Sequence, residues 1–314
     1  MAFFRKSKNQ NYDFLSGYSW YTPGVKGLFV LLGWLLVGAL LGNIIAAIFM
    51  MFLKDSGEAM EYATLISYPI MFIPPMLYAK HASNRNMAFD PGYRIDNNNF
   101  SPVGGWILAA LVMVGTLGCA LCMDSVNSQM PPMPKWLEDA LGSMTGGTLW
   151  VNFLCVSIFA PIFEEWLCRG MILRGLLNYE RVTKEGEKVR GLKPIWAIVI
   201  SALFFALIHM NPWQAIPAFT LGILFGYVYY RTGSLKLTML MHFSNNTMAL
   251  TLSRIDSIKD AESMLEIMSP AAYWSLFVVG IAVICLLIWV LGKVTLHSPR
   301  GNCDELPVDV PVTQ

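Results

Sequence analysis

Long apolar runs separated by short polar stretches dominate the chain. A helix needs about 20 mostly apolar residues to cross the hydrocarbon core of a bilayer. By that measure the pattern predicts about eight transmembrane helices, of which the second contains three prolines and the seventh is short and polar. The predicted spans are residues 27–53, 62–78, 103–123, 146–164, 194–210, 213–230, 237–252 and 271–291.

Composition gives the same fold class. The chain is 55% hydrophobic and 14% charged, with a mean hydropathy of +0.50, whereas soluble proteins carry about 25% charged residues. The sequence therefore predicts an all-α, polytopic membrane protein whose main partner is the lipid bilayer, and it excludes a cytosolic or secreted globular enzyme. A net charge of +1 provides no basic excess for phosphates, so we expect no nucleic-acid partner.

Basic residues predict the orientation. If both termini are cytoplasmic, sixteen Lys and Arg residues fall in inside segments, and only Lys54, Lys135, Arg254 and Lys259 fall outside. The positive-inside rule favours this arrangement. We expect a cytoplasmic N-terminal segment at 1–26, a single transmembrane helical domain at 27–294 and a cytoplasmic tail at 295–314. The first apolar run is too long for a signal peptide, and no transit or retention signal is seen, which favours a bacterial inner membrane.

Two pairs of glycines spaced four residues apart allow helices to approach closely. They are Gly38 with Gly42 and Gly222 with Gly226. We expect both pairs to serve packing within the chain, so they do not imply an oligomer.

Ionisable side chains are rare and costly inside a bilayer, and each is therefore a candidate functional group. The apolar segments contain few of them. The candidates, with one amide that lies four residues after a histidine, are Glu164, Glu165, Arg169, His209, His242 and Asn246.

Depth in the membrane decides whether these groups can meet. Glu164 lies 14 residues before the loop at 178–193, and His209 lies 16 residues after it, which places them roughly 21 and 24 Å from that loop. If the two helices are antiparallel neighbours, Glu164 and His209 lie at the same depth. His242 lies about 9 Å above the cytoplasmic end of its own helix. It reaches the same level if the fourth and fifth helices extend roughly 10 Å into the cytoplasm, with 166–177 as a partly interfacial segment.

A Glu, two His and an Asn at one depth are compatible with three interpretations. A desolvated carboxylate can act as a general base on water, while imidazole and amide groups donate to an oxyanion, as in a peptide hydrolase. Two imidazoles and a carboxylate can instead hold zinc, although no HExxH spacing supports this. The same groups can also form ion pairs that only hold helices together. We predict no metal site and no cofactor, with zinc as the disfavoured alternative.

The order of the motifs discriminates among these interpretations. Residues 164–169 read EExxxR, residues 205–209 read FxxxH and residues 242–246 read HxxxN. This set resembles the CPBP family of CAAX proteases and bacteriocin-processing enzymes, whose eukaryotic members are the type II CAAX-prenyl endopeptidases. The resemblance covers a protease-like core at about 146–252.

The resemblance implies an intramembrane glutamate-dependent endopeptidase that opens toward the cytoplasm. Position by position, it implies that Glu164 activates water with help from His209, and that His242 and Asn246 stabilise the oxyanion. Glu165 and Arg169 would have supporting roles, with Arg169 paired to a glutamate. Phe205 would pack against His209.

The resemblance also implies the partner, which is a membrane-associated peptide or protein substrate cleaved near the cytoplasmic side. The alternative is a non-catalytic membrane scaffold or immunity-type regulator that acts through partner contacts. A third possibility is a metal-dependent hydrolase or an ion-translocating protein.

Overall fold

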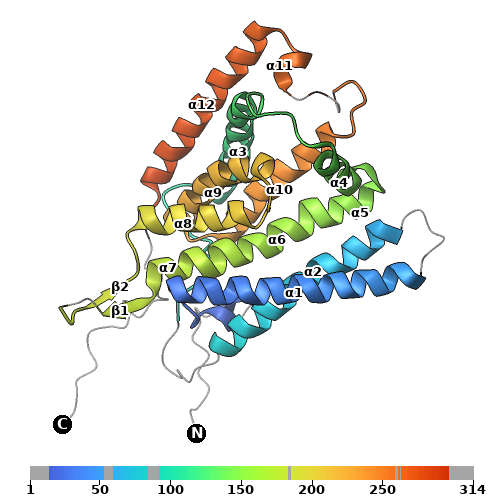
Figure 1. Cartoon of the computed structure of the whole chain (residues 1–314). Helices are drawn as coiled ribbons and strands as arrows, with labels where there is room; N and C mark the ends of the chain where they lie inside the picture. The colour runs from blue at the N-terminus through green and yellow to red at the C-terminus, as the bar shows by residue number, and fades with distance from the viewer. Residues whose placement is uncertain are drawn as a thin grey trace, which may run out of the picture.

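The computed structural model describes residues 14–52, 59–83, 92–182, 185–258, 261 and 263–296. Its architecture is helical, with one short hairpin (Figure 1). The elements are η1 (Phe14–Tyr18), α1 (Val25–Phe52), α2 (Ala59–Ser83), α3 (Gly105–Asn127), α4 (Lys135–Gly146), α5 (Leu149–Asn152), η2 (Phe153–Phe159), α6 (Ala160–Glu165), η3 (Trp166–Leu173), α7 (Arg174–Asn178), β1 (Glu180–Val182), β2 (Lys188–Arg190), α8 (Pro194–Leu207), α9 (Pro212–Thr232), α10 (Leu235–Leu252), α11 (Met264–Ile267) and α12 (Pro270–Lys293).

The predicted all-α membrane fold is confirmed. A helix lies over each of the eight predicted spans, and α2 runs unbroken through its three prolines. Among the described residues, four helical segments are long and apolar enough to cross a membrane: Val25–Phe52, Gly105–Asn127, Leu149–Asn178 and Pro270–Lys293. Only 17% of the most apolar window is buried in the first and last of these, against 56% in Leu149–Asn178. The protein therefore presents α1 and α12 to lipid.

The segment from α5 to α7 is one continuous helical rod through the centre of the molecule (Figure 1). Two π-helical stretches, η2 and η3, flank α6, which has six residues, or about one and a half α-helical turns. A π-helix has i→i+5 hydrogen bonds and is frequent at functional sites. Every side chain of η3 is buried. Neighbouring helices therefore cover residues 166–173, while the expectation that 166–177 is partly interfacial stays a prediction, since burial within the protein does not give depth in the bilayer.

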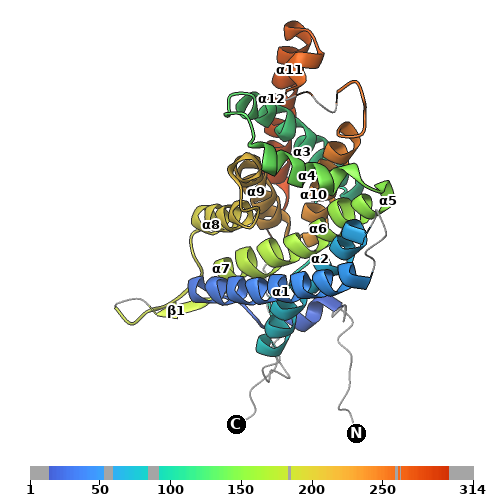
Figure 2. The same ribbon diagram turned by 45° about the vertical axis from the view of Figure 1, so that its right-hand side comes forward.

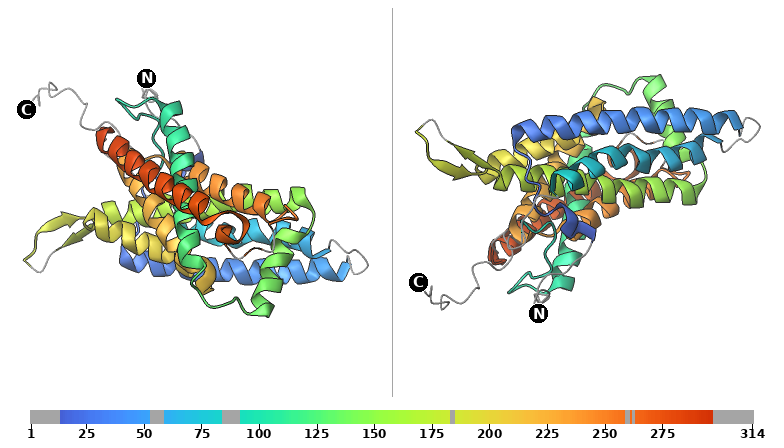
Figure 3. Two further views of the ribbon diagram at one scale, coloured as in Figure 1. Left: turned by 90° about the horizontal axis from the view of Figure 1, so that it is seen from above. Right: turned by 90° about the horizontal axis from the view of Figure 1, so that it is seen from below.

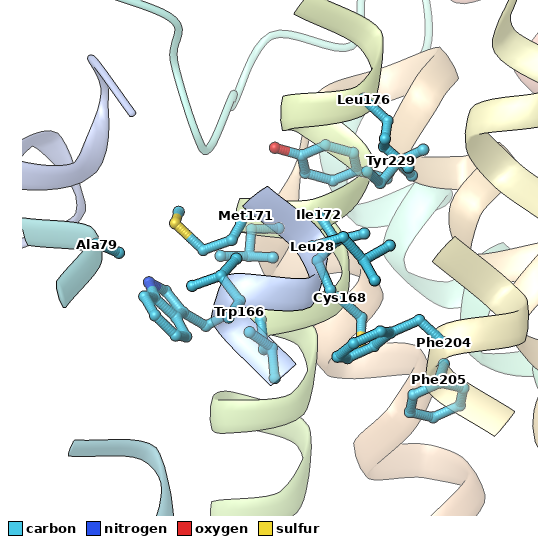
Figure 4. Packing of buried hydrophobic residues seen from close by; sticks show 14 of the residues in the cluster. Leu28, Ala79, Trp166, Cys168, Met171, Ile172, Leu176, Phe204, Phe205 and Tyr229 are labelled. Atoms are coloured by element: carbon cyan, nitrogen blue, oxygen red, sulfur yellow. The ribbon is translucent and has the colours of Figure 1, made fainter. Parts of the chain in front are cut away.

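The core around η3 explains why this stretch is apolar. Figure 4 shows Trp166, Met171 and Ile172 of η3 among side chains of other helices, including Leu28 of α1 and Phe204 of α8. All of these side chains are less than 9% exposed. The rod is thus held by protein on several sides, which fixes the direction of any polar group that it carries.

Helices pack in neighbouring pairs, with α1 along α2, α8 along α9 and α12 along α3 (Figure 3). The predicted use of the glycine pairs within the chain is confirmed. A Cβ at Gly38 would lie 2.0 Å from the Met71 carbonyl oxygen, and one at Gly226 would lie 3.0 Å from the Ile198 side chain. These contacts join α1 to α2 and α8 to α9.

Several helix ends that carry basic residues lie on one side of the molecule. The start of α1, the end of α7 with the β1–β2 hairpin and the end of α12 all lie toward the left of Figure 1. After a turn of 45°, α11 lies at the top of the view, away from the hairpin at the left (Figure 2). The hairpin lies in the stretch at 178–193 for which the sequence indicated only a loop.

Arg174 joins the rod to two distant segments. Its guanidinium is 1% exposed and donates only to carbonyl oxygens, at distances of 2.6 to 3.2 Å. The acceptors belong to Gly170, Tyr18, Ser19, Tyr21 and Tyr93. The part of the predicted N-terminal segment that is described is therefore packed onto the helical domain. Residues 1–13 and, in the predicted tail, 297–314 lie outside the described residues.

Candidate active site

The candidate residues come from three parts of the fold. Glu164 and Glu165 end α6, and Arg169 follows one turn later in η3. His242 and Asn246 lie one turn apart on α10. His209 lies in the turn that follows α8.

A buried charged cluster joins two of the three motifs. Oε1 of Glu165 lies 2.6 Å from Nη1 of Arg169 and 3.2 Å from Nδ1 of His242. The Glu165 and Arg169 side chains are 0% exposed. Arg169 also donates from Nη2 to the Gly222 carbonyl oxygen at 3.2 Å. The expected pairing of Arg169 with a glutamate is present, and the partner is Glu165.

Phe205 connects this cluster to the third motif. The Arg169 guanidinium carbon lies 4.4 Å from the centre of the Phe205 ring, within the range of a cation–π contact. The same ring stands edge-on to both imidazoles, with centroids 5.1 Å from His209 and 5.4 Å from His242. Phe205 therefore packs against His209 as expected, and it also contacts His242.

The backbone around His209 fixes its tautomer. Nδ1 lies 2.8 Å from the Phe205 carbonyl oxygen. Because a carbonyl only accepts, Nδ1 carries a proton, and in the neutral imidazole Nε2 is therefore the acceptor. Helix α8 ends at Leu207, three residues before the predicted end, because the next helix starts soon after it. Asn211 is the N-cap of α9 and accepts from the Gln214 backbone N–H, and Pro212 is the first residue of α9.

Glu164 has a partner that lies outside all three motifs. The Tyr68 hydroxyl of α2 donates to its Oε1 at 2.5 Å, across 96 positions of sequence. Oε2 of Glu164 is buried and has no hydrogen-bond partner among the described residues. The carboxylate is thus held at one oxygen, while the other is buried without a hydrogen-bond partner.

Asn246 is anchored to the first π-helical stretch. Its Nδ2 donates to the Val156 carbonyl oxygen of η2 at 2.8 Å, and its Oδ1 accepts from Asn245 at 3.1 Å. An amide nitrogen has two N–H groups, so one remains for a further acceptor.

The structure therefore brings Glu165, Arg169, His242, Phe205 and His209 into one cluster. Within the described ranges, no hydrogen bond joins the Glu164 carboxylate to either histidine or to Asn246. Over the same ranges, no group of three His, Cys, Asp or Glu side chains is arranged to hold a metal ion.

The comparison with protein families agrees with this geometry. Residues 146–248 match the Rce1-like family model, described as type II CAAX prenyl endopeptidase Rce1-like. This segment is similar to the Rce1-like domain. It covers about a third of the 314 residues and carries all three motifs, so the predicted resemblance is confirmed. Searches of curated proteins and of solved structures gave no match. The Rce1-like match supports a membrane-embedded protease.

Two contacts of the site could not be found from the three motifs. Tyr68 lies outside the Rce1-like segment, and its only signal is a hydroxyl in the middle of an apolar span. Asp96 accepts from the Ser234 hydroxyl and the Lys236 backbone N–H at 3.1 and 3.2 Å, which fixes the start of α10. That helix carries His242 and Asn246.

Proposed function

We propose that the protein is an intramembrane endopeptidase in which Glu164 activates the water that cleaves a membrane-associated peptide or protein. The observation that carries the proposal is the arrangement of the Rce1-like segment. Its two adjacent carboxylates sit between π-helical stretches, and one of them pairs with His242 beside Phe205 and His209.

The hydrolytic step assigns a task to each group. Oε2 of Glu164 takes a proton from water as the water oxygen bonds to the carbonyl carbon of the scissile peptide. The proton then passes to the departing nitrogen as the C–N bond breaks, which gives a carboxylic acid and an amine. Nε2 of His209 is an acceptor and orients the attacking water.

His242 and Asn246 are the proposed oxyanion donors. Because Glu165 occupies Nδ1 of His242, the imidazolium form has Nε2–H free to donate. Asn246 adds its second amide N–H. Donors that are fixed before the reaction stabilise the developing charge without reorganising, and each is worth about 10²- to 10³-fold in rate.

We propose a substrate that is prenylated and is reached from the cytoplasmic side. The family description supports a CAAX-type peptide. The excess of basic residues at the end of the molecule with the hairpin supports cytoplasmic termini.

The test of activity is a fluorogenic peptide that ends in a farnesylated CAAX sequence, presented to the full chain in proteoliposomes. The intact protein should cleave it, and Glu164→Gln should lose at least about 100-fold, the usual contribution of a general base. Glu138→Gln, a change of the same kind on exposed α4, is the control. Wild-type rates in a folded Glu164→Gln protein would refute the proposal. Comparing membrane proteomes of cells holding the two forms then identifies natural substrates.

Orientation has its own test. Cysteines placed at Glu187 in the hairpin and at Ser128 after α3 are both exposed. In intact cells, a membrane-impermeant maleimide should label only the cysteine at position 128. Labelling of position 187 alone would reverse the proposed topology.

A further inference from the structure

Tyr68 stands outside the Rce1-like segment, yet its hydroxyl donates to the carboxylate proposed as the base. We infer that Tyr68 is a positioning residue, which fixes Glu164 through Oε1 and leaves Oε2, which has no hydrogen-bond partner among the described residues, as the oxygen that takes the proton from water. The inference rests on the proposed function. It adds α2 to the machinery of the site.

Aromatic packing holds the phenol in place. The Phe72 ring, one turn after Tyr68, stacks on Phe163 of α6 with centroids 5.2 Å apart and an interplanar angle of 15°. Phe163 also contacts Phe159 at 6.1 Å, and Tyr68 contacts Phe72 at 5.7 Å. Phe163 directly precedes Glu164. The same stack therefore sets the distance between the phenol and the carboxylate.

The backbone of α2 is fixed at this level by α1. A Cβ at Gly38 would lie 2.0 Å from the Met71 carbonyl oxygen, and one at Gly42 would lie 2.8 Å from that of Ser67. These two carbonyls bracket Tyr68. The Met71 carbonyl has no helical N–H four residues later because Pro75 has none, which lets the bare Gly38 backbone lie against it.

A fixed carboxylate is what the proposed step requires. Placement errors of about 1 Å can cost 10²-fold in rate, and the hydrogen bond at Oε1 restricts the rotation of the carboxylate. Besides Tyr68, the ionisable groups around the Glu164 carboxylate are Glu165 on α6, Cys155 on η2, and Cys168 and Arg169 on η3. Among the described residues, Tyr68 is the group that hydrogen-bonds to Glu164.

The kinetic test replaces Tyr68 by Phe in the full chain and uses the farnesylated CAAX peptide as substrate. Tyr68→Phe keeps the ring and should lower kcat by about 10- to 100-fold, the worth of one hydrogen bond to a charged group, with KM little changed. Tyr78→Phe is the matched control, because Tyr78 lies on the same helix and packs on Trp34 and Tyr21. Equal kcat values for Tyr68→Phe and the intact protein would overturn the inference.

A spectroscopic test does not depend on activity. The infrared carboxyl band that Glu164→Gln removes should shift in Tyr68→Phe and stay in place in Tyr78→Phe. An unshifted band in a folded Tyr68→Phe protein would overturn the inference. If the band shifts but the intact protein cleaves no probe, the pairing stands and the proposed function fails.

Discussion

Glu165 and Arg169 form an ion pair from which solvent is excluded, with 2.6 Å between Oε1 and Nη1 and neither side chain exposed. Glu165 directly follows the proposed base, and its partner lies over the Phe205 ring. The pair therefore ties the direction of α6 to α8 and, through His242, to α10.

Removing the cation should be costly. Arg169→Met leaves the Glu165 carboxylate buried beside His242 alone, and we expect a loss of about 3–5 kcal/mol in the free energy of unfolding. The measurement is denaturant unfolding of the purified protein in detergent. Lys236→Met is the control, because Lys236 pairs with Asp96 while 61% exposed and should cost less than about 1 kcal/mol. Similar losses in both variants would contradict the interpretation.

The Asn246→Ala variant distinguishes an enzyme from a non-catalytic scaffold. Asn246→Ala removes a proposed oxyanion donor and should lower kcat by about 10²- to 10³-fold. Ser244→Ala lies on the same helix, where its hydroxyl bonds only to the Leu240 carbonyl, and should change kcat less than about twofold. A scaffold would instead complement a deletion strain with either variant. Full complementation by a folded Asn246→Ala protein would favour the scaffold.

The closest approach of α1 to α2 should tolerate no side chain. Gly38→Ala places a methyl group against the Met71 carbonyl oxygen, and we expect about 1–3 kcal/mol of destabilisation from overpacking. Gly33→Ala is matched in chemistry and helix but meets nothing within 4 Å. It should be neutral or slightly stabilising. Thermal unfolding of both variants decides the point, and a neutral Gly38→Ala would show that α2 can shift.

Lysine should not replace the guanidinium of Arg174. A lysine has three donors in place of the five hydrogen bonds made here, so carbonyls are left without partners and we expect a loss of about 2–4 kcal/mol. Limited proteolysis should also cut the segment before α1 faster. Arg231→Lys is the comparison, since Arg231 binds three carbonyls at the exposed end of α12. It should lose about 1 kcal/mol or less. If Arg174→Lys were as mild as Arg231→Lys, the Arg174 contacts would not matter for stability.

Much of the helical plan follows from the chain itself. Apolar runs long enough to cross a bilayer predicted eight spans, and a helix lies over each of them. The glycine pairs on α1 and α9 indicated where helices pack closely. The rarity of charge in apolar segments marked Glu165, Arg169 and His242, and Glu165 does contact each of the other two. Their roles in the reaction stay predictions.

Other features have no local signal. The π-helical stretches depend on how neighbouring helices pack, and the pairing of Tyr68 with Glu164 spans 96 positions. The segment 166–177 was predicted at the interface because it mixes arginines with apolar residues. In the structure, Arg169 is paired with Glu165 and Arg174 donates to backbone carbonyls, which a sequence pattern does not reveal.

The contacts of the Arg174 guanidinium decide whether the Rce1-like segment can fold apart from the rest of the chain. Four of its five acceptors belong to Tyr18, Ser19, Tyr21 and Tyr93, all ahead of the Rce1-like segment. A fragment cut out at residues 146–248 would carry this cation into a nonpolar interior with little to receive it. The borders of sequence similarity are therefore not the borders of an autonomous folding unit, and grafting this chemistry into another protein would require the leading helices as well.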